Sequence, residues 1–70
     1  MKKIDYWNYR LIKKNGYIGI YEVYYSKDKP HSCTEERLAP MGETLKEIKE
    51  DLKSMSKALK LPVLNYEDFK

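Results

Sequence analysis

Aromatic and β-branched residues dominate the first part of the chain, and the apolar positions change to a helical spacing further on. Residues 6–25 are rich in Tyr and Ile, which favour strands. Residues 43–60 are instead rich in Lys, Glu and Leu, and their apolar positions recur at steps of three and four residues. A sheet segment followed by a helical segment predicts an α+β domain.

The dipeptide Asn15-Gly16 predicts a tight turn between two strands over about residues 6–14 and 17–25. Both central residues of a type I′ turn need a positive φ, which Asn and Gly tolerate. A two-residue loop also fixes the register of the hairpin. The expected cross-strand pairs are Lys14 with Tyr17, Leu11 with Ile20, and Trp7 with Tyr24.

A single helix is predicted over about residues 44–60. Thr44 and Glu47 have the spacing of a capping box, in which each side chain accepts from the other's backbone amide. Pro62 ends the helix by about Lys60, because the residue before a proline is pushed out of the helical region. One face of this helix carries the apolar positions Leu45, Ile48, Leu52, Met55 and Leu59. We expect this face to pack on the sheet and to bury Leu52 fully.

Two shorter extended segments complete the predicted sheet. A third strand is expected over about residues 31–36, after a polar turn that ends at Pro30, and a short extended segment over 61–64 follows the helix. The whole chain, 1–70, is predicted to form one small domain. Its expected architecture is a three-stranded antiparallel sheet in β-β-β-α order, with an optional short fourth strand and one amphipathic helix on one face.

The hairpin register sorts the strand side chains into two faces. The more apolar face, which we expect the helix to cover, carries Trp7, Tyr9, Leu11, Ile18, Ile20 and Tyr24. The opposite face is rich in tyrosine and carries Arg10 among the rings. Because one helix cannot cover both faces, the second is predicted to be an exposed partner-binding surface. Its predicted binding residues are Tyr6, Arg10, Tyr17, Tyr21 and Tyr25.

Composition narrows the classes of protein. The 70 residues allow one domain with a modest core, so self-association as a homodimer is one expected source of stability. The net charge of +3 comes from 14 basic and 11 acidic residues that are interspersed, unlike the clustered charge of an obligate nucleic-acid binder. No apolar run reaches the length of a membrane helix or a signal peptide. A single cysteine fits a cytoplasmic protein.

Catalytic and metal-binding patterns are sparse. Cys33 and His31 are two residues apart, so a cysteine–histidine nucleophile pair on one strand face is geometrically allowed, but it lacks an orienting third group and a pocket. The acidic residues near the helix suit capping and a solvated face better than a metal site. We therefore expect no enzyme activity, no metal and no cofactor.

A resemblance adds to this interpretation. The order of hairpin, third strand, a Gly42-Glu43-Thr44-Leu45-x-Glu47 segment, a long helix and a Leu61-Pro62-Val63 tail resembles the HicB-like antitoxin domain over about residues 7–64. The resemblance implies a partial RNase H-like sheet without its acidic catalytic centre, and domains of this kind bind protein toxins and often self-associate.

Two functions follow as hypotheses. The first is a non-enzymatic protein-binding module, of antitoxin or small-inhibitor type, that docks through the tyrosine-rich face. The alternative is a single-stranded nucleic-acid binder that uses the same face, because aromatic rings on a sheet with flanking cations stack on bases. Salt dependence separates the two, since counterion release makes only nucleic-acid affinity fall steeply with salt.

Overall fold

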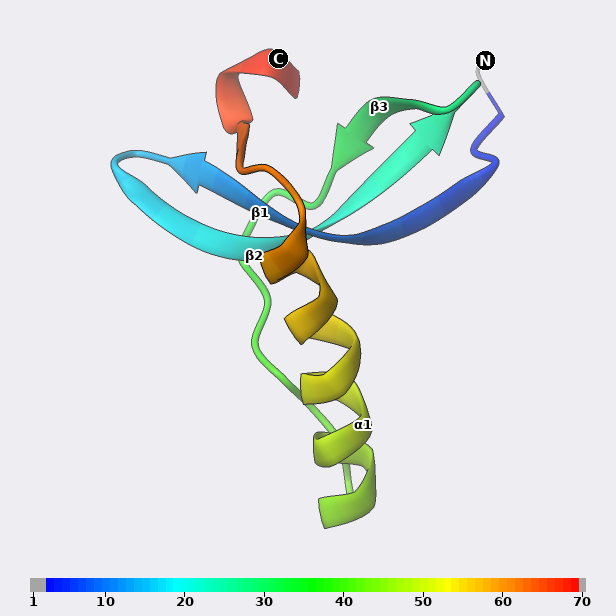
Figure 1. Ribbon diagram of the computed structural model, residues 1–70, viewed down its shortest axis with the longest axis vertical. Helices are drawn as coiled ribbons and strands as arrows, with labels where there is room; N and C mark the ends of the chain where they lie inside the picture. Colours follow the sequence, from blue (N-terminus) through cyan, green and yellow to red (C-terminus); the bar gives the residue numbers. More distant parts are fainter. Residues whose placement is uncertain (1–2, 70) are drawn as a thin grey trace.

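The computed structural model describes residues 3–69, which form a curled mixed sheet of four strands and one α-helix (Figure 1). Three antiparallel strands, β1 (Tyr6–Lys14), β2 (Tyr17–Ser26) and β3 (Lys29–Cys33), make most of the sheet. A short β4 (Leu64–Asn65) pairs in parallel with β1 and gives the order β3-β2-β1-β4. The predicted α+β class and strand–helix order are confirmed.

The β1–β2 hairpin has the turn and the register that the sequence predicts. Asn15 and Gly16 have φ of 53° and 84°, the left-handed values that a two-residue turn of this type requires. Lys14 pairs with Tyr17 and the ladder continues without interruption to Tyr6 and Tyr25. The hairpin is therefore specified by local chemistry at its turn.

The third strand begins earlier than predicted. The expected range was 31–36, whereas β3 covers Lys29–Cys33. The reason is a second tight turn in which Lys27 and Asp28 both adopt positive φ, of 53° and 62°. Such values are costly for residues with a side chain, and the Asp5 carboxylate helps to hold the turn by accepting the Lys27 amide at 2.9 Å.

Helix α1 (Leu45–Ser56) continues into a 3₁₀ turn, η1 (Lys57–Lys60), so the helical range ends where predicted but its last four residues form a 3₁₀ turn. Its capping box is present. The Glu47 amide donates to Thr44 Oγ1, and the Thr44 amide donates to Glu47 Oε1, each at 3.2 Å. Within residues 3–69, no helix has both the length and the apolar content needed to cross a membrane.

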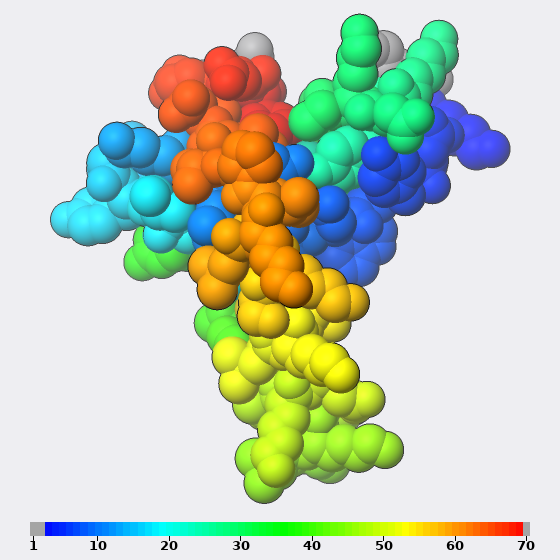
Figure 2. Space-filling view, viewed as in Figure 1, coloured from blue at the N-terminus to red at the C-terminus, as the bar shows by residue number. Residues whose placement is uncertain are grey.

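The helix lies on the predicted face of the sheet but touches it mainly through its C-terminal end. Tyr9, on that face, donates a hydrogen bond to Asp51 of α1. Only Met55 and Ala58 are buried in α1 and η1, and the N-terminal turns project away from the sheet (Figures 1 and 2). The prediction that Leu52 is fully buried is wrong, because its side chain is 50% exposed.

The other face of the sheet is covered by the C-terminal segment. The sheet curls around residues 61–69, which include β4 and the 3₁₀ turn η2 (Tyr66–Phe69) (Figure 1). The core here consists of Ile12, Tyr21, Val23 and Tyr25, with Cys33, Leu64, Tyr66 and Phe69 packed against it. Each face of the sheet is thus covered by a different part of the chain that follows β3.

Candidate functional site

The tyrosine-rich face that the sequence predicts as exposed is mostly interior. Tyr21 and Tyr25 are only 3% and 5% exposed, so the exposure expected for them is wrong. Tyr6 and Tyr17 remain 44% and 78% exposed. The expectation failed because the polar C-terminal tail carries two aromatic residues that dock on this face. A partner-binding role for this face stays a prediction, and it can rest only on its exposed rim.

Four of the five predicted site residues contact the core or the C-terminal segment, and the fifth lies apart. Tyr6 stacks on Tyr25 with ring centroids 4.7 Å apart. Arg10 donates to Tyr25 Oη and to the Pro62 carbonyl, both at 2.9 Å. Tyr21 packs at 6.4 Å from the ring of Tyr66. Tyr17 lies at the hairpin end. Arg10 and Tyr21 therefore help to hold the domain's own C-terminal segment in place.

A row of leucines on the helix is exposed instead. Leu45, Leu52 and Leu59 follow each other at seven-residue steps, close to two helical turns, so they lie nearly in line. Their side chains are 70%, 50% and 69% exposed. We call these three residues the leucine stripe. The sequence predicted this apolar helix face correctly. The prediction that the sheet covers it is wrong, because the helix meets the sheet along the neighbouring Met55 side.

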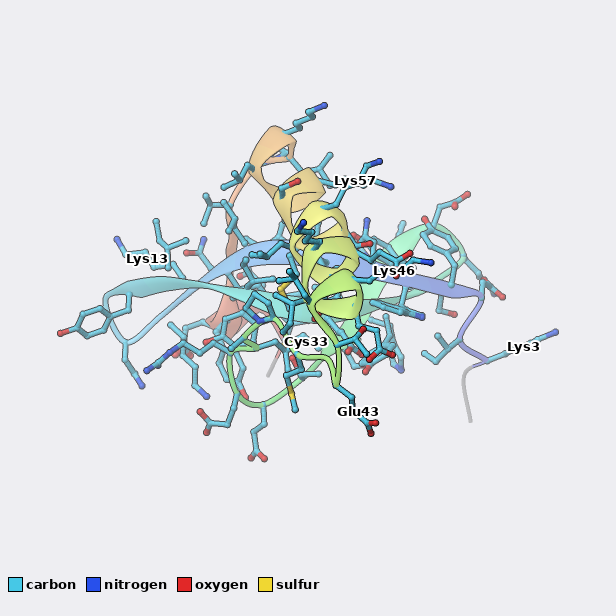
Figure 3. All side chains as sticks on the ribbon, turned by 90° about the horizontal axis from the view of Figure 1, so that it is seen from below. Lys3, Lys13, Cys33, Glu43, Lys46 and Lys57 are labelled. Atoms are coloured by element: carbon cyan, nitrogen blue, oxygen red, sulfur yellow. The ribbon has the colours of Figure 1, made fainter. Side chains whose placement is uncertain are left out.

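Five lysines follow the same helix beside the leucine stripe. Their steps of three, four, four and three residues place them along one side of α1 and η1, and all five are exposed. We call this set the lysine row: Lys46, Lys49, Lys53, Lys57 and Lys60. Figure 3 shows Lys46 and Lys57 on the helix, whereas Lys3 and Lys13 lie at opposite ends of the sheet.

A shallow cavity of about 350 Å³ lies where the helix meets β1, on the other side of the lysine row. It is lined by Trp7, Asn8, Tyr9, Asp51, Ser54, Lys57 and Leu61. Trp7 is 49% exposed and packs edge-to-face against Tyr9, with centroids 5.2 Å apart. We call this hollow between the helix and β1 the Trp7 cavity. Lys57 belongs both to this cavity and to the lysine row, so the two features are continuous.

Two polar groups in the lining of the Trp7 cavity, the Tyr9 phenol and the Asp51 carboxylate, are already bonded, whereas Asn8 Oδ1 is buried without a hydrogen-bond partner among the described residues. Tyr9 Oη donates to Asp51 Oδ1 at 3.2 Å, and the Met41 amide donates to Asp51 Oδ2 at 2.8 Å. Burial and this hydrogen bond to a carboxylate raise the pKa of the Tyr9 phenol above its ordinary value. The phenol is thus held in its neutral form and both Asp51 oxygens accept a hydrogen bond. The exposed lining of the cavity is mainly apolar.

The cysteine and histidine of β3 have different surroundings. Cys33 is half-buried against the core, and burial raises the pKa of its thiol more than nearby Lys14 lowers it. A raised pKa disfavours the thiolate, which is the nucleophilic form. His31 is exposed beside the β2–β3 turn. The residues described here contain no group of three or more His, Cys, Asp or Glu side chains placed to hold a metal ion.

Comparison with known proteins gives no match: no family model, no curated protein and no solved structure corresponds to this chain.

Proposed function

We propose that this domain is a non-enzymatic protein-binding module that docks through the leucine stripe of α1 and η1. The observation that carries the proposal is the exposure of Leu45, Leu52 and Leu59, which leaves between half and 70% of each side chain in water. Burying a leucine side chain is worth about 1.5–3 kcal/mol relative to leaving it exposed. A partner that covered these side chains would gain that free energy, less the entropy lost on association.

The form of the surface supports a protein partner. An amphipathic helix that lays its apolar side into a groove is a common mode of protein recognition, with anchors spaced by whole helical turns. The leucine stripe has this spacing, and α1 projects away from the sheet, so a partner can approach it freely (Figure 2). Both sheet faces, by contrast, are covered at least in part by the domain itself.

The proposal keeps the antitoxin or small-inhibitor type and a cytoplasmic setting, but moves the docking surface from the tyrosine face to the helix. The segment from Gly42 to Glu47, which carries the resemblance to the HicB-like domain, forms a helix opening with a capping box. That feature supports the resemblance. The single-stranded nucleic-acid alternative depends on the tyrosine face, whose central rings are covered by residues 61–69.

A photo-crosslinking amino acid at position 52 tests the proposal. We expect it to form an adduct with one defined protein in the cells that produce the domain, and we expect Leu45→Asp or Leu59→Asp to abolish the adduct. The matched control places the same crosslinker at Lys13, an exposed position at the far end of the hairpin (Figure 3). Adducts only with nucleic acid or lipid, or equal adducts from both positions, would contradict the proposal.

A further inference from the structure

The surroundings of the leucine stripe also define the chemistry of what binds there. This step rests on the proposed function and goes beyond it. We infer that the partner is an acidic amphipathic segment of a protein. Its apolar side chains cover the leucine stripe, its carboxylates lie along the lysine row, and one apolar or aromatic side chain enters the Trp7 cavity.

Charge is the first ground for this inference. The domain's net charge is only +3, yet five lysines lie on the side of the helix beside the leucines, with Glu50 as the one acidic residue among them. The other acidic residues of the helix lie on a different side and are already engaged, because Glu47 caps the helix and Asp51 is bonded to Tyr9 and to the Met41 amide. A partner with Glu or Asp beside its apolar residues would meet complementary charge along the whole helix, which speeds and orients association.

The same charges argue against a second copy of this chain on the leucine stripe. In a two-fold antiparallel pair of helices, each contact is made twice by the same surface, so one lysine row would face the other. Like charges placed opposite each other are destabilising. A parallel pair would bring the two sheets together at the same end of the helices, where the molecule is much broader than α1 (Figure 2).

The Trp7 cavity supplies an anchor point. Its volume of about 350 Å³ lies at the lower end of the range for small-molecule sites and accommodates a large apolar side chain. Trp7, Tyr9 and Leu61 give it apolar walls, and Lys57 stands at its edge on the lysine row. Tryptophan and tyrosine in central pockets dominate the energetics of many interfaces. The lysine row lies between the cavity and the leucine stripe, so a segment bound along this row can place a side chain in the cavity at its Lys57 edge.

Trp7 is the only tryptophan in the chain, so its fluorescence reports directly on the cavity. The probe is a synthetic helical peptide of about 18 residues, a length at which helices become stable in water, with leucine on one face, one phenylalanine and glutamate elsewhere. The matched peptide has lysine in place of each glutamate. We expect the acidic peptide to shift the emission of Trp7 to shorter wavelength and to saturate, and the basic peptide to leave it unchanged.

Two charge-reversal variants then locate the binding surface. Lys53→Glu with Lys57→Glu should weaken binding of the acidic peptide at least tenfold, about 1.4 kcal/mol. Lys3→Glu with Lys13→Glu makes the same change in net charge at the two ends of the sheet and should weaken binding less than threefold, because screening limits charges at that distance. Circular dichroism of both variants checks that the helix is retained.

The remaining outcomes separate this inference from the proposed function. Equal binding of acidic and basic peptides, with loss on Leu52→Asp alone, would overturn the acidic chemistry and leave the leucine stripe as the docking surface. Binding of phosphatidylserine vesicles or single-stranded DNA, but of neither peptide, would overturn both. A dimer in sedimentation that Leu52→Asp dissociates would replace the acidic segment by a second copy.

Discussion

The tyrosine-rich sheet face and the leucine stripe are both apolar surfaces in the sequence, but the folded chain treats them in opposite ways. On the sheet, Tyr21, Val23 and Tyr25 are at most 5% exposed, because residues 61–69 return and cover them. On the helix, the three leucines are at least 50% exposed, and nothing within the described chain covers them. An apolar pattern therefore predicts that something must cover a surface. The chain's topology decides whether a segment of the same chain covers it or whether it stays open to another molecule.

The two surfaces also differ in the contacts at their edges. The sheet face has polar anchors that fasten the covering segment, since Arg10 bonds the Pro62 carbonyl and Lys14 lies 4.3 Å from the centre of the Tyr66 ring. The leucine stripe has a lysine row beside it whose members are exposed. The basic residues next to the covered surface are thus engaged within the domain, whereas those next to the exposed surface remain available to another molecule.

The largest expected effect is in the sheet core. Ile12→Ala removes a side chain that is 0% exposed, and we expect a loss of about 2–5 kcal/mol in the free energy of unfolding. Ile18→Ala is the matched control, because Ile18 is on the same hairpin and 57% exposed, and we expect it to cost below about 1 kcal/mol. Urea denaturation followed by circular dichroism measures both. Equal losses in the two variants would show that the core is elsewhere.

The next largest effect is expected for a variant that tests whether the C-terminal segment covers the tyrosine-rich face. Tyr66→Ala removes a half-buried ring that packs near Tyr21 and lies under the Lys14 ammonium, so we expect a loss of about 1–3 kcal/mol. The variant should also bind a fluorescent dye for apolar surface more strongly than the native domain. Met41→Ala, at a position 76% exposed, is the control. Unchanged stability and dye binding for Tyr66→Ala would contradict the covering.

Local chemistry made much of this fold predictable. The turn at Asn15-Gly16 and the capping box of Thr44 and Glu47 depend on residues within four positions of each other, and both formed as predicted. The turn at Lys27 and Asp28 lies inside the predicted polar turn, but its two-residue form was not predicted, because a lysine does not signal the positive φ that it adopts here. It is held in part by Asp5, which is distant in sequence and accepts the Lys27 amide.

The burial of the two surfaces was not predictable in the same way, because it depends on which distant segment docks where. The bond from Arg10 to the Pro62 carbonyl joins residues 52 positions apart, and periodicity carries no information about such a contact. Tyr66 and Phe69 were the available signal, since two aromatic residues in an otherwise polar tail favour docking. The exposure of Leu52 had no signal in the sequence, because its heptad spacing is the same for a covered helix face.

The leucine stripe should contribute little to the stability of the isolated domain. We expect Leu52→Ala to change the free energy of unfolding by below about 1 kcal/mol, because the side chain is half exposed and alanine is the better helix former. Met55→Ala, on the same helix at 3% exposure, is the comparison and should cost clearly more. If Leu52→Ala lost as much as Met55→Ala, the stripe would be covered in solution, and sedimentation would show whether a second copy covers it.

The smallest expected effect concerns the hydrogen bond from Tyr9 of β1 to Asp51 of α1, which joins the sheet to the helix. Burial and this bond raise the pKa of the Tyr9 phenol, so the folded domain favours the neutral form. The resulting stability is present below the ordinary tyrosine pKa of about 10 and is lost as pH rises through the higher folded value. Tyr24 behaves likewise, because its bond to Glu22 raises its pKa.

Tyr9→Phe should therefore cost below about 1 kcal/mol at neutral pH, where the partly exposed hydrogen bond is lost. It should also reduce the decline in the urea midpoint between about pH 9 and about pH 12, since one raised phenol no longer titrates. Tyr17→Phe, at the exposed end of the hairpin, should leave the alkaline decline as it is in the native domain. An alkaline decline that Tyr9→Phe left unchanged would show that the bond to Asp51 does not hold the helix on the sheet in solution.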